Sequence, residues 1–434
     1  MGRTGLAPGD PERLGGYWLA GRLGAGGQGV VYEAYDETGA RVAVKALHTD
    51  VAAAPGLRAR LAGEVAAARR VASSCTARLI AADPAAPEPY IVSEYVGGPS
   101  LREAVAAGGT LAGDRLVRLA VAVATALAAL HEAGVVHRDL KPDDVLLGPD
   151  GPRVIDFGVT RTKRTSAAFP AQAVGSPPYM APEALTAGRV GPAADVFAWG
   201  AVVLFAATGR SPFEAGSVGE VLHRVLTCEP ATDVLPEPLR TLAAAALDKD
   251  PGARPSSRDL LLGLLGRAGG APPGERIGAL LDEGARRAAG PPAAPDAAYR
   301  ALGEVAEEVY AGLDPAARAA VPGILLRVVA PGGGGAGTVR RAAAQEFSPA
   351  DGPLLDAFAA AGLLVRQDGG VRLATAALPC AWPRLRGWLE AERARRRRLF
   401  AAVLAALAVL TAVALTAGLL AGLPPAPSPA GRPG

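Results

Sequence analysis

The sequence predicts an α+β chain with two lobes, one rich in strands and one helical, followed by a mainly helical segment and a final apolar helix. Three observations lead to this prediction. Residues 15–267 alternate short β-type runs with longer helical runs. Residues 268–296 are rich in Gly, Pro and Ala, which is typical of a linker, with one short helix predicted around Ile277–Arg287. Residues 399–423 carry no charged side chain.

Composition excludes several classes of protein. At about 150 residues per domain, 434 residues correspond to two or three folded units. The 55 glycines and 38 prolines follow no fixed period, which excludes collagen, and the long aliphatic runs exclude a wholly disordered chain. The net charge is only +3, so no nucleic-acid partner is expected. The three cysteines are far apart and predict neither a metal site nor a disulfide framework.

A glycine-rich turn near the start of the chain has the pattern G-x-G-x-x-G-x-V. It leads into two strand-like runs, Val30–Tyr35 and Arg41–Leu47, joined by a hairpin turn. A dinucleotide-binding unit would instead enter a helix directly after the glycines. Backbone amides of such a turn can approach phosphate oxygens, and Lys45 on the second strand could reach the same phosphates. The residues of the turn are Leu23, Gly24, Ala25, Gly26, Gly27, Gln28, Gly29, Val30 and Val31.

Two later motifs identify the family that this turn resembles. Residues 137–144 read H-R-D-L-K-P-D-D, and D-F-G follows at residues 156–158. With the glycine-rich turn, they make residues 15–267 similar to the bacterial Ser/Thr protein kinases of actinomycetes. The resemblance implies a bilobal protein kinase fold with a β-rich N-lobe and a helical C-lobe. It also implies ATP and Mg²⁺ or Mn²⁺ as cofactors, and transfer of the γ-phosphoryl group to Ser/Thr hydroxyls of protein substrates.

The resemblance assigns the catalytic roles. Asp139 would accept or orient the proton of the substrate hydroxyl, and Lys141 would stabilise the transferring phosphoryl group. Glu64, on a helical run over residues 57–71, would pair with Lys45. Only four lysines occur in this arginine-rich chain, and two of them fall at these positions. Asp156 would bind Mg²⁺, and backbone groups near Glu94 and Val96 would bind adenine.

Asp144 departs from the family pattern, which has asparagine at this position as a metal ligand. A carboxylate can still coordinate a hard cation, but its charge beside Asp139 and Asp156 could raise a neighbouring pKa or displace the metal. The chain contains no asparagine at all, which favours a tolerated substitution. The alternative to an active enzyme is a pseudokinase, an ATP-binding signalling scaffold.

The activation segment and three further positions complete the resemblance. Arg138 would pair with a phosphate in the segment after D-F-G, and autophosphorylation there would be favoured by a homodimer. Asp195 would anchor the catalytic loop, and Arg254 would pair with Glu183. The candidate phosphorylation sites are Thr160, Thr162, Thr165 and Ser166.

Residues 297–390 predict helices over Ala301–Leu313, Pro315–Val329 and Leu354–Val365, then a short strand over Val371–Ala374. Helices, a small hairpin and a closing helix describe a winged-helix-like segment. The string around Trp382–Leu389 resembles a segment of bacterial STAND-type signalling ATPases, although no P-loop accompanies it. The alternative is an α-helical spacer.

The last residues predict a membrane anchor. An arginine-rich run over 391–398 precedes the uncharged residues 399–423, which would form a transmembrane helix about 37 Å long. Residues 424–434 form a short Pro-rich tail. Because positive charge stays on the cytoplasmic side, we expect a single-pass protein of the cell membrane, with its kinase domain in the cytoplasm and its C-terminus outside.

Overall fold

A computed structural model describes residues 3–27, 29–48, 57–71, 73–156, 177–186, 188, 190–267, 276–290, 299–330, 338–367 and 369–421. The chain divides into two compact units. The first comprises Met1–Val305 and Thr375–Ala377, and the second comprises Ala306–Ala374 and Leu378–Gly434.

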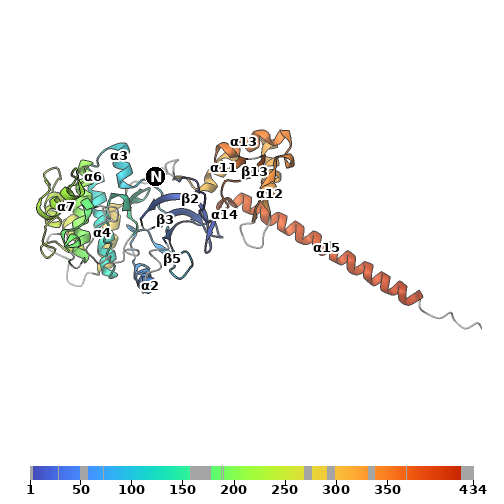
Figure 1. Cartoon of the computed structure of the whole chain (residues 1–434), viewed down its shortest axis with the longest axis horizontal. Helices are drawn as coiled ribbons and strands as arrows, with labels where there is room; N and C mark the ends of the chain where they lie inside the picture. The colour runs from blue at the N-terminus through green and yellow to red at the C-terminus, as the bar shows by residue number, and fades with distance from the viewer. Residues whose placement is uncertain are drawn as a thin grey trace, which may run out of the picture. The chain divides into compact units, whose positions relative to one another are not determined.

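The N-terminal lobe of the first unit is an antiparallel sheet of six strands in the order β1-β2-β3-β4-β6-β5 (Figure 1). Its core consists of apolar side chains at alternating positions of neighbouring strands, such as Tyr32 and Ala34, and Val42 and Val44. Helix α2 (Leu57–Ala68) belongs to the same lobe. The strands are β1 (Arg13–Leu14), β2 (Tyr17–Gly26), β3 (Gly29–Tyr35), β4 (Arg41–Leu47), β5 (Leu79–Asp83) and β6 (Tyr90–Glu94).

The C-terminal lobe of this unit is built around two helices, α4 and α6, that are apolar on nearly all faces and therefore buried. The indole N–H of Trp199 on α6 donates to the carbonyl of Ala120 on α4 at 2.9 Å. The bilobal kinase fold predicted from the motifs is thus confirmed. The remaining elements are α3 (Leu101–Gly108), α4 (Gly113–Glu132), the single-turn helix η1 (Pro142–Asp144), β7 (Val145–Gly148), β8 (Gly151–Val154), η2 (Pro177–Tyr179), α5 (Pro182–Leu185), α6 (Pro192–Thr208), α7 (Val218–Thr227), α8 (Leu239–Ala246) and α9 (Ser257–Leu264).

Helix α10 (Ile277–Ala288) lies within the segment predicted as a linker, where the sequence indicates one short helix. Its apolar face packs on the C-lobe, and Leu280 and Leu281 belong to the same hydrophobic core as α4. Gly284 lets α10 approach α4 closely, because a Cβ at this position would lie 2.3 Å from the hydroxyl of Thr125. This helix is therefore part of the lobe.

The second unit is mainly helical with a small three-stranded sheet in the order β11-β13-β12. The predicted helices and the hairpin are present, but the helix predicted over Leu354–Val365 ends at Ala360, and residues 364–365 belong to a strand. The indole of Trp382 is buried among Tyr310, Phe358 and Trp388. Its elements are α11 (Leu302–Gly312, whose first turn belongs to the first unit), α12 (Pro315–Val328), β9 (Val329–Ala330), β10 (Thr338–Val339), β11 (Ala342–Ala343), η4 (Ala344–Glu346), η5 (Pro349–Asp351), α13 (Gly352–Ala360), β12 (Leu364–Gln367), β13 (Gly370–Leu373), α14 (Leu378–Ala381) and α15 (Pro383–Ala421).

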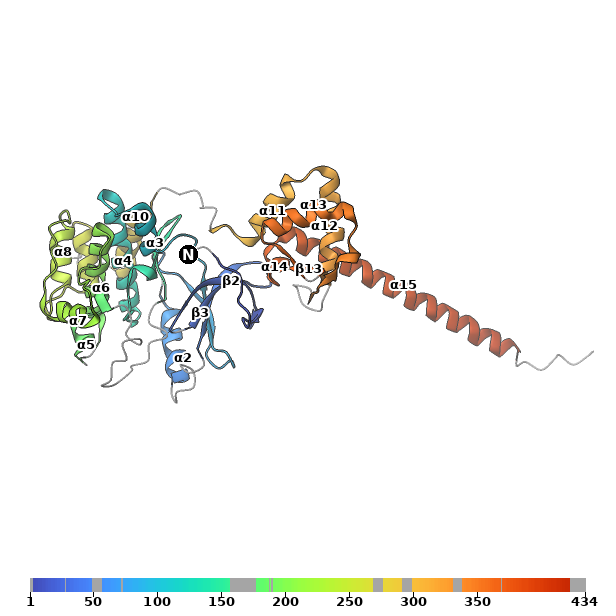
Figure 2. The same cartoon turned by 45° about the horizontal axis from the view of Figure 1, so that its top comes forward.

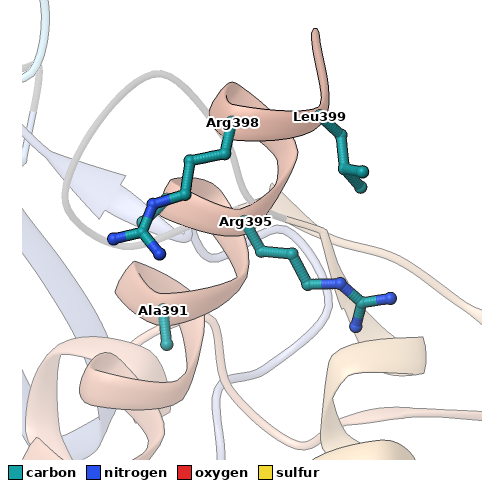
Figure 3. Close-up of a pocket in the computed structure, with 5 residues that line it drawn as sticks. Ala391, Arg395, Arg398 and Leu399 are labelled. Carbon is teal, nitrogen blue, oxygen red and sulfur yellow. The ribbon is translucent and has the colours of Figure 1, made fainter. Parts of the chain in front are cut away.

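The predicted transmembrane helix over 399–423 is wrong, and so is the single-pass membrane localisation that depended on it. Helix α15 is one continuous helix (Figure 2), yet within the part of the chain that the structure describes no helix is long and apolar enough to cross a membrane. Along α15, the turns before residue 399 carry exposed arginines, including Arg395 and Arg398, whose side chains point away from each other (Figure 3).

Candidate active site

The glycine-rich turn is the hairpin between β2 and β3, with Gly26 paired to Gly29. Gly29 has φ +153°, and a Cβ there would lie 1.9 Å from the carbonyl oxygen of Ala46 on β4. Only glycine fits so close to the neighbouring strand. Gln28 lies outside the described residues. Seven of the other eight turn residues belong to the two strands, Leu23, Gly24, Ala25 and Gly26 to β2 and Gly29, Val30 and Val31 to β3.

Lys45 and Asp156 meet at the junction of the two lobes. Lys45 lies in the middle of β4, paired to Val31 on one side and Ile91 on the other. Its ammonium nitrogen is 3.1 Å from Oδ2 of Asp156, which follows β8 in a left-handed backbone conformation with φ 59°. The lysine side chain is largely buried, whereas Asp156 is partly open to solvent. The fold therefore places together the two residues predicted to bind phosphate and metal.

The catalytic loop is held by Asp195, at the start of the buried helix α6. Its carboxylate accepts the backbone N–H of His137 at 2.8 Å and that of Arg138 at 2.7 Å. Arg138 has φ 67°, a conformation that costs a non-glycine residue about 1–3 kcal/mol and persists where the surroundings enforce it. The imidazole of His137 is buried, and burial lowers its pKa. The Asp195 anchor therefore positions the residue that follows, Asp139.

His131 was not predicted as part of this anchor. Its Nε2 lies 2.8 Å from Oδ2 of Asp195, the oxygen that also accepts the backbone N–H of His137. Its Nδ1 lies 2.8 Å from the hydroxyl of Ser257 on α9. The contacts from Ser257 through His131 to Asp195 resemble those of a hydrolytic triad. However, Asp195 and Ser257 are only 1% and 5% exposed. The arrangement therefore supports the loop and is closed to a substrate. A lone histidine near the end of a helix gives no signal of this role in the sequence.

Lys141 lies between two carboxylates of the catalytic loop. Its ammonium nitrogen is 2.8 and 2.9 Å from the two oxygens of Asp144 and 3.4 Å from Oδ2 of Asp139. Asp144 is 4% exposed. Burial raises the pKa of Asp144 to about 8, since the nearby Asp156 and Asp139 carboxylates offset much of the stabilisation by Lys141. The site thus holds one carboxyl group that is costly to ionise.

The donor set fits a magnesium ion bound together with phosphates. No preformed cluster of three acidic, histidine or cysteine ligands occurs among the described residues. Mg²⁺ is commonly held by one or two protein carboxylates, with water and substrate phosphates completing its shell. Asp156 and Asp144 would supply these oxygens, and a cation there would offset the mutual repulsion that raises the pKa of Asp144.

Glu64 on α2 contacts Arg138, whose Nη1 lies 3.3 Å from the Glu64 carboxylate. The sequence predicts Lys45 as the partner of Glu64 and a phosphate as the partner of Arg138. The structure therefore places Glu64 and Arg138 in contact with each other. Both side chains are about one-third exposed, so the pair contributes at most about 1 kcal/mol and can exchange partners readily.

The connection between the lobes begins at the end of β6. Glu94, its last residue, is paired to Val42 on β4, and its carboxylate accepts from Arg153 at 2.7 Å. Val96 follows two residues later and is half-buried. The backbone groups predicted to bind adenine therefore lie beside the strand that carries Lys45.

The predicted pair of Arg254 and Glu183 is buried and bidentate, with N···O distances of 2.8 and 2.9 Å. Nε of Arg102 donates to both oxygens of Asp143, at 3.0 and 2.9 Å, a contact that was not predicted because the two residues are 41 positions apart. The candidate phosphorylation sites Thr160, Thr162, Thr165 and Ser166 lie outside the described residues.

A lysine beneath a glycine-rich hairpin, an anchored H-R-D loop and an aspartate after β8 define a protein kinase. The Protein kinase domain family model matches residues 17–262, and the chain belongs to this family. The Novel STAND NTPase 1 model matches residues 295–405, so both predicted resemblances are confirmed.

Relatives of known name support the same family. The probable serine/threonine-protein kinase PkwA of Thermomonospora curvata is 47% identical over 257 residues, which are 59% of this chain and 35% of that protein. The serine/threonine-protein kinase AfsK of Streptomyces coelicolor is 42% identical over 253 residues, 58% of this chain and 32% of that protein. The matched region is about a third of the length of these relatives.

The raised pKa of Asp144 predicts a pH-dependent cost in stability. The group is protonated in the folded protein up to pH about 8, whereas in the unfolded chain it ionises near 3.8. The free energy of unfolding is therefore highest below pH about 4, and it falls as the pH rises toward 8. Relative to Asp144→Asn, the wild type should therefore lose folding stability as the pH rises from about 5 to 8.

Thermal unfolding of both proteins in EDTA, across this pH range, tests the prediction. Added Mg²⁺ should reduce the difference, because a bound cation favours the ionised carboxylate. Parallel pH profiles for wild type and Asp144→Asn in EDTA would contradict it.

Proposed function

We propose that this chain transfers the γ-phosphoryl group of ATP to Ser/Thr hydroxyls of protein substrates. The observation that supports this most is the grouping of two lysines and three aspartates at the lobe junction. Lys45 contacts Asp156, and Lys141 contacts Asp139 and Asp144. Phosphoryl transfer needs positioned positive charge and one base, and this grouping provides both.

Each residue then has a physical task. Magnesium ATP supplies the phosphoryl group and a cation that offsets its negative charge. Lys45, which lies on the strand next to the glycine-rich hairpin, orients the phosphates. Asp139 accepts the proton of the attacking hydroxyl, and Lys141 is close enough to Asp139 to stabilise charge on the transferring group. The anchor from Asp195 keeps Asp139 in place, so little reorganisation accompanies the reaction.

A small hollow lies beside Asp139. It is lined by Leu140, Tyr179, Met180 and Ala181 as well as by the catalytic loop. The hydroxyl of Tyr179 lies 2.7 Å from that of Ser211, which fixes one wall. We also propose that the chain phosphorylates its own activation segment in a homodimer, at one of the predicted threonines or the serine.

Phosphate incorporation by the full chain tests this proposal. Purified protein is incubated with ATP and Mg²⁺ or Mn²⁺, and modified residues are located by mass spectrometry. Lys45→Met should reduce incorporation by about 10²–10³-fold, because it removes one preorganised positive charge from the phosphates. Phosphate incorporation that is equal in wild type and Lys45→Met, or absent with both metals, would refute the proposed kinase activity.

A further inference from the structure

The N-lobe carries a second charged cluster, which the catalytic site does not use. Glu33 on β3 is completely buried. Arg41 donates to its two oxygens from Nε at 3.1 Å and Nη2 at 3.0 Å, and Arg3 donates at 3.3 Å. The hydroxyl of Tyr35 donates to the same carboxylate at 2.7 Å. A buried carboxylate requires such partners, and once formed the cluster is rigid.

This cluster binds residues 299–302, which follow the kinase fold and lie in the same compact unit. Nη1 of Arg41 donates to the carbonyl of Tyr299 at 2.7 Å, and Nη2 lies 3.3 Å from the carbonyl of Arg300. The backbone N–H of Leu302 donates to the hydroxyl of Tyr35 at 2.8 Å. The lobe therefore supplies side chains and the segment supplies backbone groups, so the cluster contacts the backbone of the chain at the start of α11.

The same contacts reach the connection between the lobes. The guanidinium of Arg41 stacks 3.6 Å from the ring centroid of Tyr95, the residue next to Val96. Val42, next to Arg41, is paired to Glu94 at the end of β6. A Cβ on Gly97 would lie 3.8 Å from Cβ of Tyr299. Residues 299–302 thus lie against the segment whose backbone we assign to adenine.

We propose that Glu33, Tyr35, Arg41 and Tyr95 form a docking site for the chain's own residues 299–302, and that docking strengthens nucleotide binding. We call these four residues the N-lobe latch. Docking would hold the connection between the lobes in one conformation. The connection would then lose less conformational entropy when adenine binds. The effect on nucleotide affinity rests on the proposed function, whereas the docking itself does not.

Arginine is specifically required at position 41. One planar guanidinium contacts Glu33, two carbonyls and an aromatic face at once, and the single ammonium group of lysine cannot match this geometry. Arg41→Lys therefore keeps the positive charge beside Glu33 and removes the contacts to the segment. Tyr35→Phe is the second variant, since it keeps the Arg41–Glu33 pair and removes the acceptor for Leu302.

Arg13→Lys is the matched control. Arg13 also pairs with a carboxylate, Glu37, lies 5.0 Å from the ring centroid of Trp18 and donates to the carbonyl of Gly15. Trp18 lies on β2, Gly15 in the turn before it and Glu37 in the turn after β3, so none of these partners belongs to residues 299–302. The control lies on the same sheet and changes the same residue type. Any general effect of replacing arginine in the N-lobe appears in it.

Hydrogen–deuterium exchange of the full chain, with ADP affinity from calorimetry, tests the proposal without requiring phosphoryl transfer. Peptides covering 299–305 should exchange about 3–10-fold faster in Arg41→Lys and Tyr35→Phe than in wild type or Arg13→Lys. The dissociation constant for ADP should rise about fivefold in Arg41→Lys. Unchanged exchange in both latch variants would overturn the docking. Faster exchange with wild-type ADP affinity would overturn the link to nucleotide binding.

Discussion

Replacing Asp139 by Asn should lower the turnover of phosphoryl transfer by about 10²–10⁴-fold, the usual contribution of a positioned general base. The amide keeps the size of the side chain and its proximity to Lys141 but cannot accept the hydroxyl proton. Asp139 is held through the backbone of His137 and Arg138, and those two hydrogen bonds do not involve its side chain. The loop should therefore keep its conformation in the variant.

Single-turnover kinetics with a peptide substrate, with ATP affinity in parallel, measures this effect. ATP affinity should stay within about twofold of wild type, because a residue that acts only in the transition state contributes little to ground-state binding. A loss of ATP binding as large as the loss of turnover would show that Asp139 acts on the nucleotide instead. Turnover close to that of wild type would remove Asp139 from the mechanism.

Replacing Glu183 by Gln should cost about 3–5 kcal/mol of folding free energy, because it leaves the Arg254 guanidinium buried without a counter-charge. The arginine side chain is fully buried and also donates to the carbonyls of Ala193 and Asp248. It cannot turn toward solvent without breaking these bonds. If the arginine did move, it would displace the first turn of helix α5, in which Glu183 lies.

Urea unfolding of the full chain, followed by tryptophan fluorescence, measures this loss. Trp199 lies in the core of the same lobe and reports its unfolding. Glu37→Gln is the control, since Glu37 pairs with Arg13 on the surface at 3.4 Å and its removal should cost less than about 1 kcal/mol. Equal losses in the two variants would mean that the buried pair has no special role in stability.

The parts of the fold and site that could be predicted from the sequence are those marked by local motifs. The spacing of H-R-D and D-F-G predicts the bilobal kinase fold, and the strands around Lys45 begin and end close to their predicted bounds. Local pattern also predicts a helix near Ile277. It does not reveal that α10 packs into the C-lobe core, because composition alone resembles that of a linker.

Long-range contacts could not be predicted from local patterns. Arg41 and Tyr299 are 258 residues apart, and no motif connects them. Likewise His131 gives no sign that it supports Asp195, because helix periodicity shows only which face it occupies. The prediction at 399–423 rested on the absence of charged residues, whereas the described part of the chain contains no helix long and apolar enough to cross a membrane.

The two hydrogen bonds that the backbone N–H groups of His137 and Arg138 donate to Asp195 also bear on how the protein loses activity on heating. Helix α6 is buried along most of its length, so it should belong to the last cooperative unit of the lobe to open. The catalytic loop is attached to that unit, while Lys45 lies on a separate sheet with its own smaller core. Partial unfolding should therefore begin in the N-lobe, and the base should remain in place after the phosphate-binding lysine has been lost.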